Sequence, residues 1–209
     1  MTNIYLVRHG ESTLNIKKVY YGWTDCDLSE DGIKQANDVE KIMEKINYEY
    51  IISSPLKRAL NTAQIINSEK ELINSNKKLI SNKEIIIDNR LKEINFGDWE
   101  NKTYKQLQSL NSDIFNKWCN DWKNTSPPQG ESFIDLYKRV VEFTNHLIHN
   151  HKDENVLIVA HQGVLRIIVS YLLKLNEDGY WNFEFTQGSY SHIQLDEKNH
   201  CTIKCLNRR

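Results

Sequence analysis

The first eleven residues constrain this chain most, because a buried strand passes into a polar turn within them. Residues 4–7 are four strand-forming residues, Ile-Tyr-Leu-Val, in a run too short for a buried helix. Arg8, His9 and Gly10 follow at once. Ligands of open α/β sheets bind at the carboxyl ends of strands, and arginine and histidine there suit anion binding and chemistry near neutral pH. The alternative is a surface Arg and His that merely end a strand.

Composition limits the partners of the protein. Its 209 residues carry a formal net charge of −1, which gives no overall attraction to nucleic acid or to an anionic membrane. No apolar run reaches the roughly 18 residues of a membrane span, and no signal-peptide pattern is present, so we expect a cytoplasmic protein. Four cysteines without metal-ligand spacing predict free thiols. Nothing resembles a linker, which predicts one α/β domain over residues 1–209.

Hydrophobic periodicity predicts alternating strands and helices. Strands are expected at residues 48–52, 85–87 and 156–160, and a closing β-hairpin at residues 191–195 and 202–206. Helices are expected at residues 29–47 behind the cap Ser29, with Ile33 on the apolar side, and from Pro55 to residue 66. Further helices are predicted at residues 133–150 and 164–175, with helical pieces within 103–122. Residues 68–84 have only a weak helical signal and are expected to form a solvated insertion.

Three predicted strands end in residues suited to chemistry. The first ends in Arg8-His9, the second in Ser53-Ser54-Pro55 with Arg58 in the next helical turn, and the third in His161-Gln162-Gly163. If these strands are parallel, two histidines and two arginines converge at one edge of the sheet. Cations packed that closely repel one another unless an anion lies between them, and a phosphoryl group suits the arginine forks.

In their order along the chain, these motifs resemble those of the histidine phosphatase superfamily, the phosphoglycerate mutase-like proteins. The matching segments are residues 6–11 with Asn15, 22–25, 53–55 with 57–59 and 62–63, Glu93 with 96–100, and 160–161 with Gly163. Within the superfamily, residues 91–100 and 128–132 look most like the α-ribazole phosphatases of cobalamin assembly. The resemblance implies a three-layer α/β/α fold whose sheet is mostly parallel with an antiparallel C-terminal edge. Asn101 departs from the pattern, where a glycine is common, and so does the long 68–84 insertion.

The resemblance also implies a reaction, phosphate monoester hydrolysis through a phosphohistidine, which needs neither a metal nor a cofactor. His9 would attack phosphorus, and Glu93 would protonate the leaving oxygen and then activate water. The phosphoryl oxygens would be held by Arg8, Arg58 and His161, with neutral donors from Asn15, the Gly22 backbone and Gln162. The expected partner is a small-molecule phosphate ester, and the resemblance favours α-ribazole 5′-phosphate. The sequence leaves the oligomeric state open.

Several alternatives stay open at this point. A phosphoglycerate mutase would carry Arg-His-Tyr after the acidic residue, whereas Ile-Asn-Phe stands at residues 94–96. A broad sugar or metabolite phosphatase would share the motifs, and a non-catalytic phospho-ligand binding module would be expected to lack His9 or Glu93. A metal site at His146, His149 and His151 lacks an acidic partner pattern. The aromatic side chains between residues 99 and 133 either stack on a benzimidazole or form a small satellite core, and aromatics at helical spacing usually pack. The residues concerned are Trp99, Trp118, Trp122 and Phe133.

Overall fold

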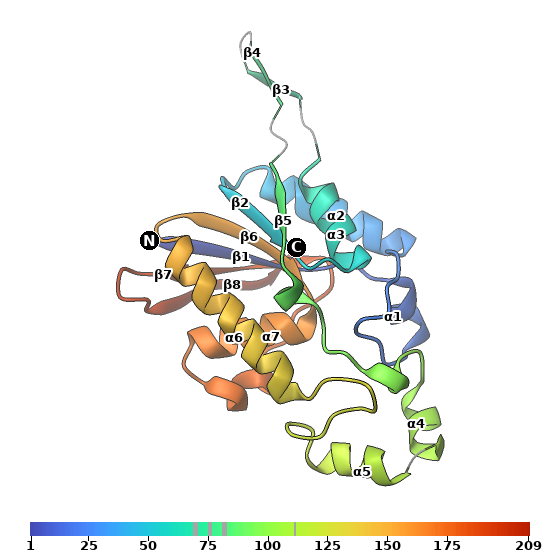
Figure 1. Cartoon of the computed structure of the whole chain (residues 1–209). Helices are drawn as coiled ribbons and strands as arrows, with labels where there is room; N and C mark the ends of the chain where they lie inside the picture. The colour runs from blue at the N-terminus through green and yellow to red at the C-terminus, as the bar shows by residue number, and fades with distance from the viewer. Residues whose placement is uncertain (69–70, 75–76, 81–82, 111) are drawn as a thin grey trace.

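A computed structural model describes residues 1–68, 71–74, 77–80, 83–110 and 112–209 of the chain. Its centre is a six-stranded sheet in the order β5-β2-β6-β1-β7-β8 (Figure 1). Neighbouring strands among the first four are parallel, and β7 and β8 pair antiparallel at the C-terminal edge, as predicted. The strands are β1 (Thr2–Arg8), β2 (Tyr50–Ser53), β5 (Ile85–Ile87), β6 (Asn155–Ala160), β7 (Ser189–Leu195) and β8 (Cys201–Arg208).

Helices cover both faces of the sheet, which confirms the three-layer α/β/α arrangement. Because side chains of a strand alternate between faces, Val156, Ile158 and Ala160 of β6 pack in one buried cluster and Leu157 and Val159 in another. The first cluster includes α6 (Phe133–Asn150) and α7 (Gln162–Leu172), and the second includes α2 (Glu30–Met43) and α3 (Lys57–Ile66). Buried on both faces, β6 is apolar throughout its last five residues.

The register of the parallel strands brings the predicted site residues together. Arg8 of β1 pairs with Ala160 of β6, so the residues that follow them, His9 and His161, lie side by side. On the other side of β6, Ser53 pairs with Val159. The convergence of the three strand ends, expected from the sequence if the strands were parallel, therefore occurs at one edge of the sheet.

Several predicted helix boundaries are wrong by a few residues. The first long helix ends at Met43 rather than near residue 47, and Ile33 is 46% exposed rather than on its apolar side. The next helix begins at Lys57, two residues after Pro55, where the Lys57 N–H donates to Asp25 Oδ1 at 2.7 Å. The helix after His161 begins at Gln162 and ends at Leu172. Helix α6, in contrast, has the predicted bounds.

The insertion at residues 68–84 contains structure that the sequence reading did not predict. Strands β3 (Glu71–Asn74) and β4 (Lys77–Ile80) pair antiparallel as a separate two-stranded sheet. They stand apart from the six-stranded sheet (Figure 1). Residues 69–70, 75–76 and 81–82 of the predicted insertion lie outside the described residues.

A third buried cluster lies beside the sheet and shows how several aromatic side chains between residues 99 and 133 pack. Trp99, Leu107 and Phe115 form it, and Trp118 packs on its edge. Trp122 instead contacts Phe133 of the main core, with ring centres 4.5 Å apart. These aromatic side chains therefore form core structure. The cluster is built from short elements, namely α4 (Tyr104–Leu110), α5 (Ser112–Asn120) and the 3-10 turn η2 (Gly97–Trp99).

The departure at Asn101 has a conformational reason. Asn101 has φ of 64°, a left-handed conformation that favours glycine and that asparagine tolerates better than most residues. Asparagine can therefore replace the glycine that the superfamily pattern often has at this position.

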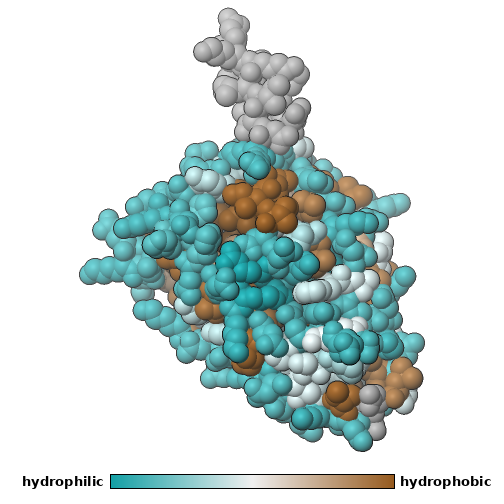
Figure 2. Space-filling view, viewed as in Figure 1, coloured by the Kyte–Doolittle hydropathy of each residue, from teal (hydrophilic) through white to brown (hydrophobic). Residues whose placement is uncertain are grey.

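The remaining elements are α1 (Thr13–Lys17) and the 3-10 turns η1 (Asn89–Leu91) and η3 (Asn176–Asn182). All four cysteines are free, as predicted. None of the helices in the described part of the chain is long and apolar enough to cross a membrane. Figure 2 shows an apolar patch over β5, where Ile86 and Ile87 are exposed on the edge strand.

Helix α6 offers a direct test of how the sequence begins a helix. Ser132 Oγ accepts from the Asp135 N–H, and the Asp135 carboxylate accepts from the Ser132 N–H at 3.1 Å, a reciprocal capping box. We expect Ser132→Ala to lower the free energy of unfolding by about 1 kcal/mol in urea denaturation. Ser109→Ala, at an exposed position in α4, is the control and should change it by less than about 0.5 kcal/mol. Equal effects of the two substitutions would contradict the capping role.

Candidate active site

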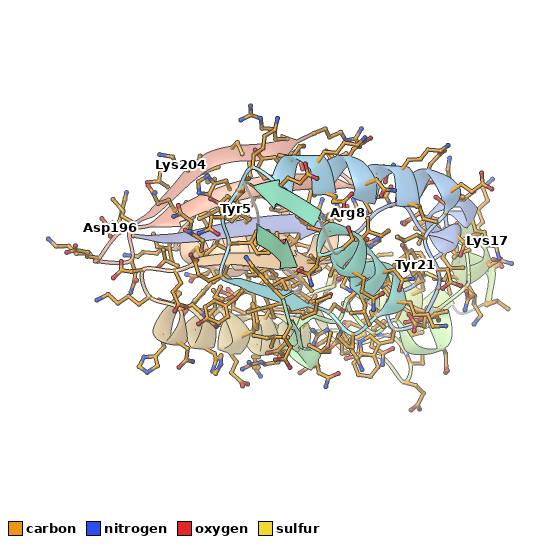
Figure 3. The ribbon with its side chains drawn as sticks, turned by 90° about the horizontal axis from the view of Figure 1, so that it is seen from above. Tyr5, Arg8, Lys17, Tyr21, Asp196 and Lys204 are labelled. Carbon is orange, nitrogen blue, oxygen red and sulfur yellow. The ribbon has the colours of Figure 1, made fainter. Side chains whose placement is uncertain are left out.

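A cavity of about 220 Å³ lies at the edge where β1, β2 and β6 end. Figure 3 shows Arg8 and Tyr21, two of its lining residues, in the half of the molecule away from the hairpin turn at Asp196. Six of the eight predicted site residues line it: Arg8, His9, Asn15, Arg58, Glu93 and Gln162. Gly22 and His161 do not, and both lie next to residues that do.

His9 is buried and held in one orientation by its neighbour. Its Nδ1 lies 2.7 Å from the Gly10 carbonyl oxygen. Since a carbonyl oxygen can only accept, Nδ1 carries the proton, and the lone pair of a neutral ring is on Nε2. Burial holds the pKa of His9 well below its ordinary value, and the charges of Arg58 and Arg8 lower it further. The ring is therefore neutral at pH 7, the form that a nucleophilic nitrogen needs.

His161 lies directly behind His9, with ring centres 5.1 Å apart. Its Nε2 is 2.8 Å from Ser54 Oγ, whereas its Nδ1 is buried and has no hydrogen-bond partner among the described residues. Burial, followed by the charge of Arg58, holds the pKa of His161 well below its usual range. If Ser54 donates to Nε2, Nδ1 of the neutral ring becomes a free N–H donor inside the site.

Backbone carbonyls, rather than carboxylates, fix the two predicted arginines. Arg8 Nη1 donates to the Phe185 oxygen at 2.6 Å, and Arg58 Nη2 donates to the Gly22 oxygen at 2.6 Å. The Nε atoms of both arginines are buried, and in the part of the chain that the structure describes they have no hydrogen-bond partner. Carbonyls orient a guanidinium without neutralising it, so both groups keep their positive charge toward the cavity.

The structure places Gly22 differently from the expectation that its N–H would face phosphate. The amides of Gly22 and Trp23 donate to Glu100 Oε1 at 3.1 and 2.7 Å, and the Thr24 amide donates to Oε2 of the same residue. Arg58 uses the carbonyls of Gly22 and Thr24. Glu100 thus holds the loop that orients Arg58, and Gly22 contributes its carbonyl.

Glu93 faces the cavity with its carboxylate tied to two backbone amides. Oε1 accepts from the Ile94 N–H and Oε2 from the Gly163 N–H in the first turn of α7, each at 3.0 Å. A Cβ atom on Gly163 would lie 2.4 Å from Glu93 Oε1. A larger residue at position 163 would therefore push the Glu93 carboxylate away from its place on this backbone.

The backbone of the Glu93 loop is anchored from α6. Arg139 Nη1 donates to the carbonyls of Arg90 and Lys92 at 2.7 and 2.6 Å, and Nη2 donates to the Glu93 carbonyl at 3.0 Å. Glu131 pairs with the same guanidinium, and its Oε1 accepts from the Asn95 amide at 2.9 Å. This half-buried ion pair fixes residues 90–95 to α6.

The two neutral predicted donors also line the cavity. Asn15 Oδ1 accepts from the Ser12 N–H at 3.0 Å, and no hydrogen bond is formed by its Nδ2 within the described residues. Gln162 is the first residue of α7, where backbone amides and the helix dipole favour an anion.

Six residues of the cavity wall were not among the predicted site residues. These are Tyr21, Ile94, Phe96, Gly163, Arg166 and Tyr180. Arg166 had a signal, because residues four apart share a helix face and Gln162 was already predicted. Tyr180 had none, since it comes from the 3-10 turn η3 after α7. Metal binding has no support from the histidines: the described residues contain no group of three or more His, Cys, Asp or Glu able to hold an ion.

The fold and this site define a phosphoglycerate mutase-like phosphatase with a histidine at the end of β1. Residues 4–209 match the histidine phosphatase superfamily (branch 1), and the chain belongs to that superfamily. It is 31% identical to the adenosylcobalamin/α-ribazole phosphatase of Escherichia coli (strain K12), over 99% of this chain and 96% of that protein. The crystal structure of the α-ribazole phosphatase from Shigella flexneri superposes with a TM-score of 0.88 at 30% identity, over 98% of this chain and 96% of that one.

Relatives with other activities are similar to a comparable degree. Phosphoserine phosphatase 1 of Hydrogenobacter thermophilus is 30% identical, over 98% of this chain and 92% of that protein. A 2,3-bisphosphoglycerate-dependent phosphoglycerate mutase from Methanococcus vannielii is 31% identical, over 100% and 97%. Identity therefore establishes the superfamily, and the substrate has to be argued from the cavity itself.

The buried histidines make stability depend on pH. Because the folded-state pKa of His161 lies below that of the unfolded chain, the unfolded chain binds more protons as the pH falls below about 6.5. The contribution of the neutral His161 to the free energy of unfolding should therefore be lost on going from pH 7 to pH 5, at up to about 1.4 kcal/mol per pH unit. We expect His161→Gln to flatten the pH dependence measured by urea denaturation. The exposed His149→Gln is the control, and equal slopes for His161→Gln and wild type would contradict the prediction.

Proposed function

We propose that the protein hydrolyses phosphate monoesters through a phosphohistidine on His9. The observation that carries this proposal is the set of buried N–H groups around the ring. The described residues contain five buried polar side-chain atoms without a partner, and three of them are Arg8 Nε, Arg58 Nε and His161 Nδ1. Unpaired buried donors are costly. A phosphoryl group between them would accept from all three and balance the two guanidinium charges.

In the first step the neutral His9 Nε2 forms a bond to phosphorus while the bond to the ester oxygen breaks. Glu93 gives its proton to that oxygen, so the alcohol leaves neutral. Arg8, Arg58 and His161 hold the equatorial oxygens, where negative charge must be stabilised. The Gly10 carbonyl accepts from Nδ1 and stabilises the positive charge that the ring gains.

In the second step water attacks the phosphohistidine. Glu93, now a carboxylate, takes a proton from the water as the oxygen bonds to phosphorus, and the phosphorus–nitrogen bond breaks. Inorganic phosphate leaves, and His9 returns to its neutral form. One carboxylate serves both steps, which agrees with its fixed position on the Gly163 amide.

We infer that the substrate is α-ribazole 5′-phosphate and that the reaction belongs to nucleotide loop assembly in cobalamin biosynthesis. The similarity to α-ribazole phosphatases supports this choice. The cavity wall also supports it, because Ile94, Phe96 and Tyr180 give it apolar and aromatic surfaces that suit a sugar carrying a benzimidazole. Trp118 and Trp122 are not among the lining residues, so neither is proposed to stack on the base.

Two other functions have weaker support. Ile94 and Phe96 line the cavity where a mutase would carry its Arg-His-Tyr segment, which disfavours mutase activity. A non-catalytic phospho-ligand binding module would need neither the lone pair on His9 nor the carboxylate of Glu93 beside it. A broader sugar or metabolite phosphatase is the remaining alternative, and a screen of phosphate monoesters including α-ribazole 5′-phosphate, sugar phosphates and 3-phosphoglycerate tests it. Cytoplasmic location, a single domain and independence of any cofactor stay predictions.

The covalent step predicts a labelled protein. Phosphate from a labelled ester should appear on His9 when the reaction is quenched in alkali, because acid destroys phosphohistidine. His9→Ala should abolish both the label and turnover, and activity should survive chelators. Exposed His146→Ala is the control and should keep both. Turnover that persists without label on His9 would contradict the mechanism.

The role of Glu93 predicts a dependence on the leaving group. Glu93→Gln keeps the shape of the side chain and removes its proton. The burst of phosphorylation should slow by roughly 10²–10⁴ for an ester with an alkoxide leaving group, the usual share of general acid catalysis. It should slow much less for a nitrophenyl ester, although steady-state turnover falls for both because the water then lacks its base. Glu142→Gln, exposed on α6, is the control. Equal slowing of the two bursts would rule out Glu93 as the acid.

A further inference from the structure

Tyr21 lines the cavity and is labelled in Figure 3, yet the proposed hydrolysis gives it no role. Its Oη lies 2.9 Å from Ser12 Oγ, and its ring lies over the guanidinium of Arg58, with the ring centre 4.7 Å from Cζ. Ser12 in turn contacts Asn15. One side chain therefore reaches two of the residues expected to bind phosphate, Asn15 through Ser12 and Arg58 directly.

A backbone group fixes the orientation of the Asn15 amide. The Ser12 backbone nitrogen lies 3.0 Å from Asn15 Oδ1, and a backbone N–H can only donate. The atom of Asn15 that faces Ser12 is therefore its oxygen, because an NH2 group there would place two donors against each other. Asn15 Nδ2 is the atom left for the cavity that Asn15 lines.

The same oxygen fixes the direction of the next two hydrogen bonds. Ser12 Oγ is 2.9 Å from Asn15 Oδ1, which can only accept, so Ser12 gives its single hydroxyl proton to Asn15. In the contact between Ser12 Oγ and Tyr21 Oη, the donor is then Tyr21. Burial raises the pKa of Tyr21, so the phenol keeps the proton that this bond needs at neutral pH.

The hydrogen bonds thus run in one direction, from Tyr21 to Ser12 to Asn15, and we call this set the Tyr21 relay. Bonds that point the same way polarise and strengthen one another. Asn15 Oδ1 has both lone pairs occupied, by the N–H and by the hydroxyl of Ser12. The relay therefore holds the amide in place and makes Nδ2 a stronger donor toward a phosphoryl oxygen. Ser12 is fully buried, which raises the cost of losing one of these bonds.

The ring of Tyr21 acts on Arg58 in a different way. Arg58 Nη1 and Nη2 donate to the carbonyls of Thr24 and Gly22 at 3.2 and 2.6 Å, and these bonds lie in the plane of the guanidinium. The Tyr21 ring covers a face of the same group, within cation–π range. The ring attracts the charge and does not neutralise it. Carbonyls and ring together fix the position of a cation that is 1% exposed.

We propose that Tyr21 is a positioning residue for the phosphoryl group, whose hydroxyl orients Asn15 through Ser12 and whose ring orients Arg58. This inference rests on the proposed function for the identity of the ligand. The two parts of the side chain act on different phosphate-binding residues, so substitutions can separate them.

The test measures the Kd of inorganic phosphate by titration calorimetry, which needs no turnover. Tyr21→Phe keeps the ring and removes the donor, and it should raise this Kd about 3- to 10-fold, the scale of one hydrogen bond. In an Asn15→Ala background the same substitution should change the Kd by less than about twofold, because the relay then ends on no phosphate ligand. A loss of stability alone would not produce this difference between the two backgrounds.

Tyr21→Leu removes the ring as well as the hydroxyl. It should raise the Kd a further 3- to 30-fold or about that relative to Tyr21→Phe, the scale of a cation–π contact that is partly or fully desolvated. This further loss should persist in the Asn15→Ala background, because it acts through Arg58. Tyr20→Phe is the matched control: the Tyr20 ring packs against Phe96 and Trp118, and the Kd should stay within about twofold of wild type.

An equal loss for Tyr21→Phe in the wild type and in Asn15→Ala would overturn the inference, because Tyr21 would then act on phosphate without Asn15. No loss in the wild type would overturn it too, and equal Kd values for Tyr21→Leu and Tyr21→Phe would overturn the role of the ring. If Tyr21→Leu does not fold, the two Tyr21→Phe measurements still decide the inference. Hydrolysis is tested separately: p-nitrophenyl phosphate turnover that persists in His9→Ala would contradict the mechanism and leave these binding comparisons unaffected.

Discussion

The structure depends on how it keeps several positive charges unneutralised in a small space. Arg8, Arg58 and Arg166 each donate to backbone carbonyls, and within the described residues none of them pairs with a carboxylate. Arg139, in contrast, pairs with Glu131 below the Glu93 loop and serves as a structural anchor. A carbonyl oxygen fixes the direction of a guanidinium group, and the positive charge of that group stays available for a ligand. This difference separates the arginines that can bind an anion from the one that holds the fold.

The carboxylates of the site are likewise held by the backbone, through amide N–H groups. Glu93 and Glu100 both accept from backbone amides, Glu93 from Ile94 and from the first turn of α7, and Glu100 from residues 22–24; within the described residues neither forms an ion pair. Glu100 orders the loop at residues 22–24, whose carbonyls then orient Arg58, so a carboxylate acts on a cation through the backbone between them. Segments from distant parts of the chain therefore hold one another, and residues 22–24 use their amides toward Glu100 and their carbonyls toward Arg58.

Much of the fold and part of the site could be predicted from the sequence, because strands of four to six apolar residues and their polar ends are local patterns. The ends of β1 and β6 placed His9 and His161 side by side, as the register requires. Hydrogen bonds between loops that are far apart in the sequence have no local sequence pattern that predicts them. The Gly22 amide donates to Glu100, 78 residues away in the chain, and the arginine-holding carbonyls at Phe183 and Phe185 have no side-chain signature at all. The antiparallel pair of strands β3 and β4 was missed because the polar composition of this segment resembles that of a loop.

The wall of the cavity, more than overall similarity, carries the information on the substrate. Relatives of about equal identity act on different phosphate esters or transfer phosphate, so the shared part of the site explains the shared chemistry at phosphorus. Besides the residues proposed to act on phosphorus, the wall carries Ile94, Phe96 and Arg166. Two of these side chains are apolar, and the third is a cation. The two apolar side chains suit the base of α-ribazole 5′-phosphate, the substrate proposed above.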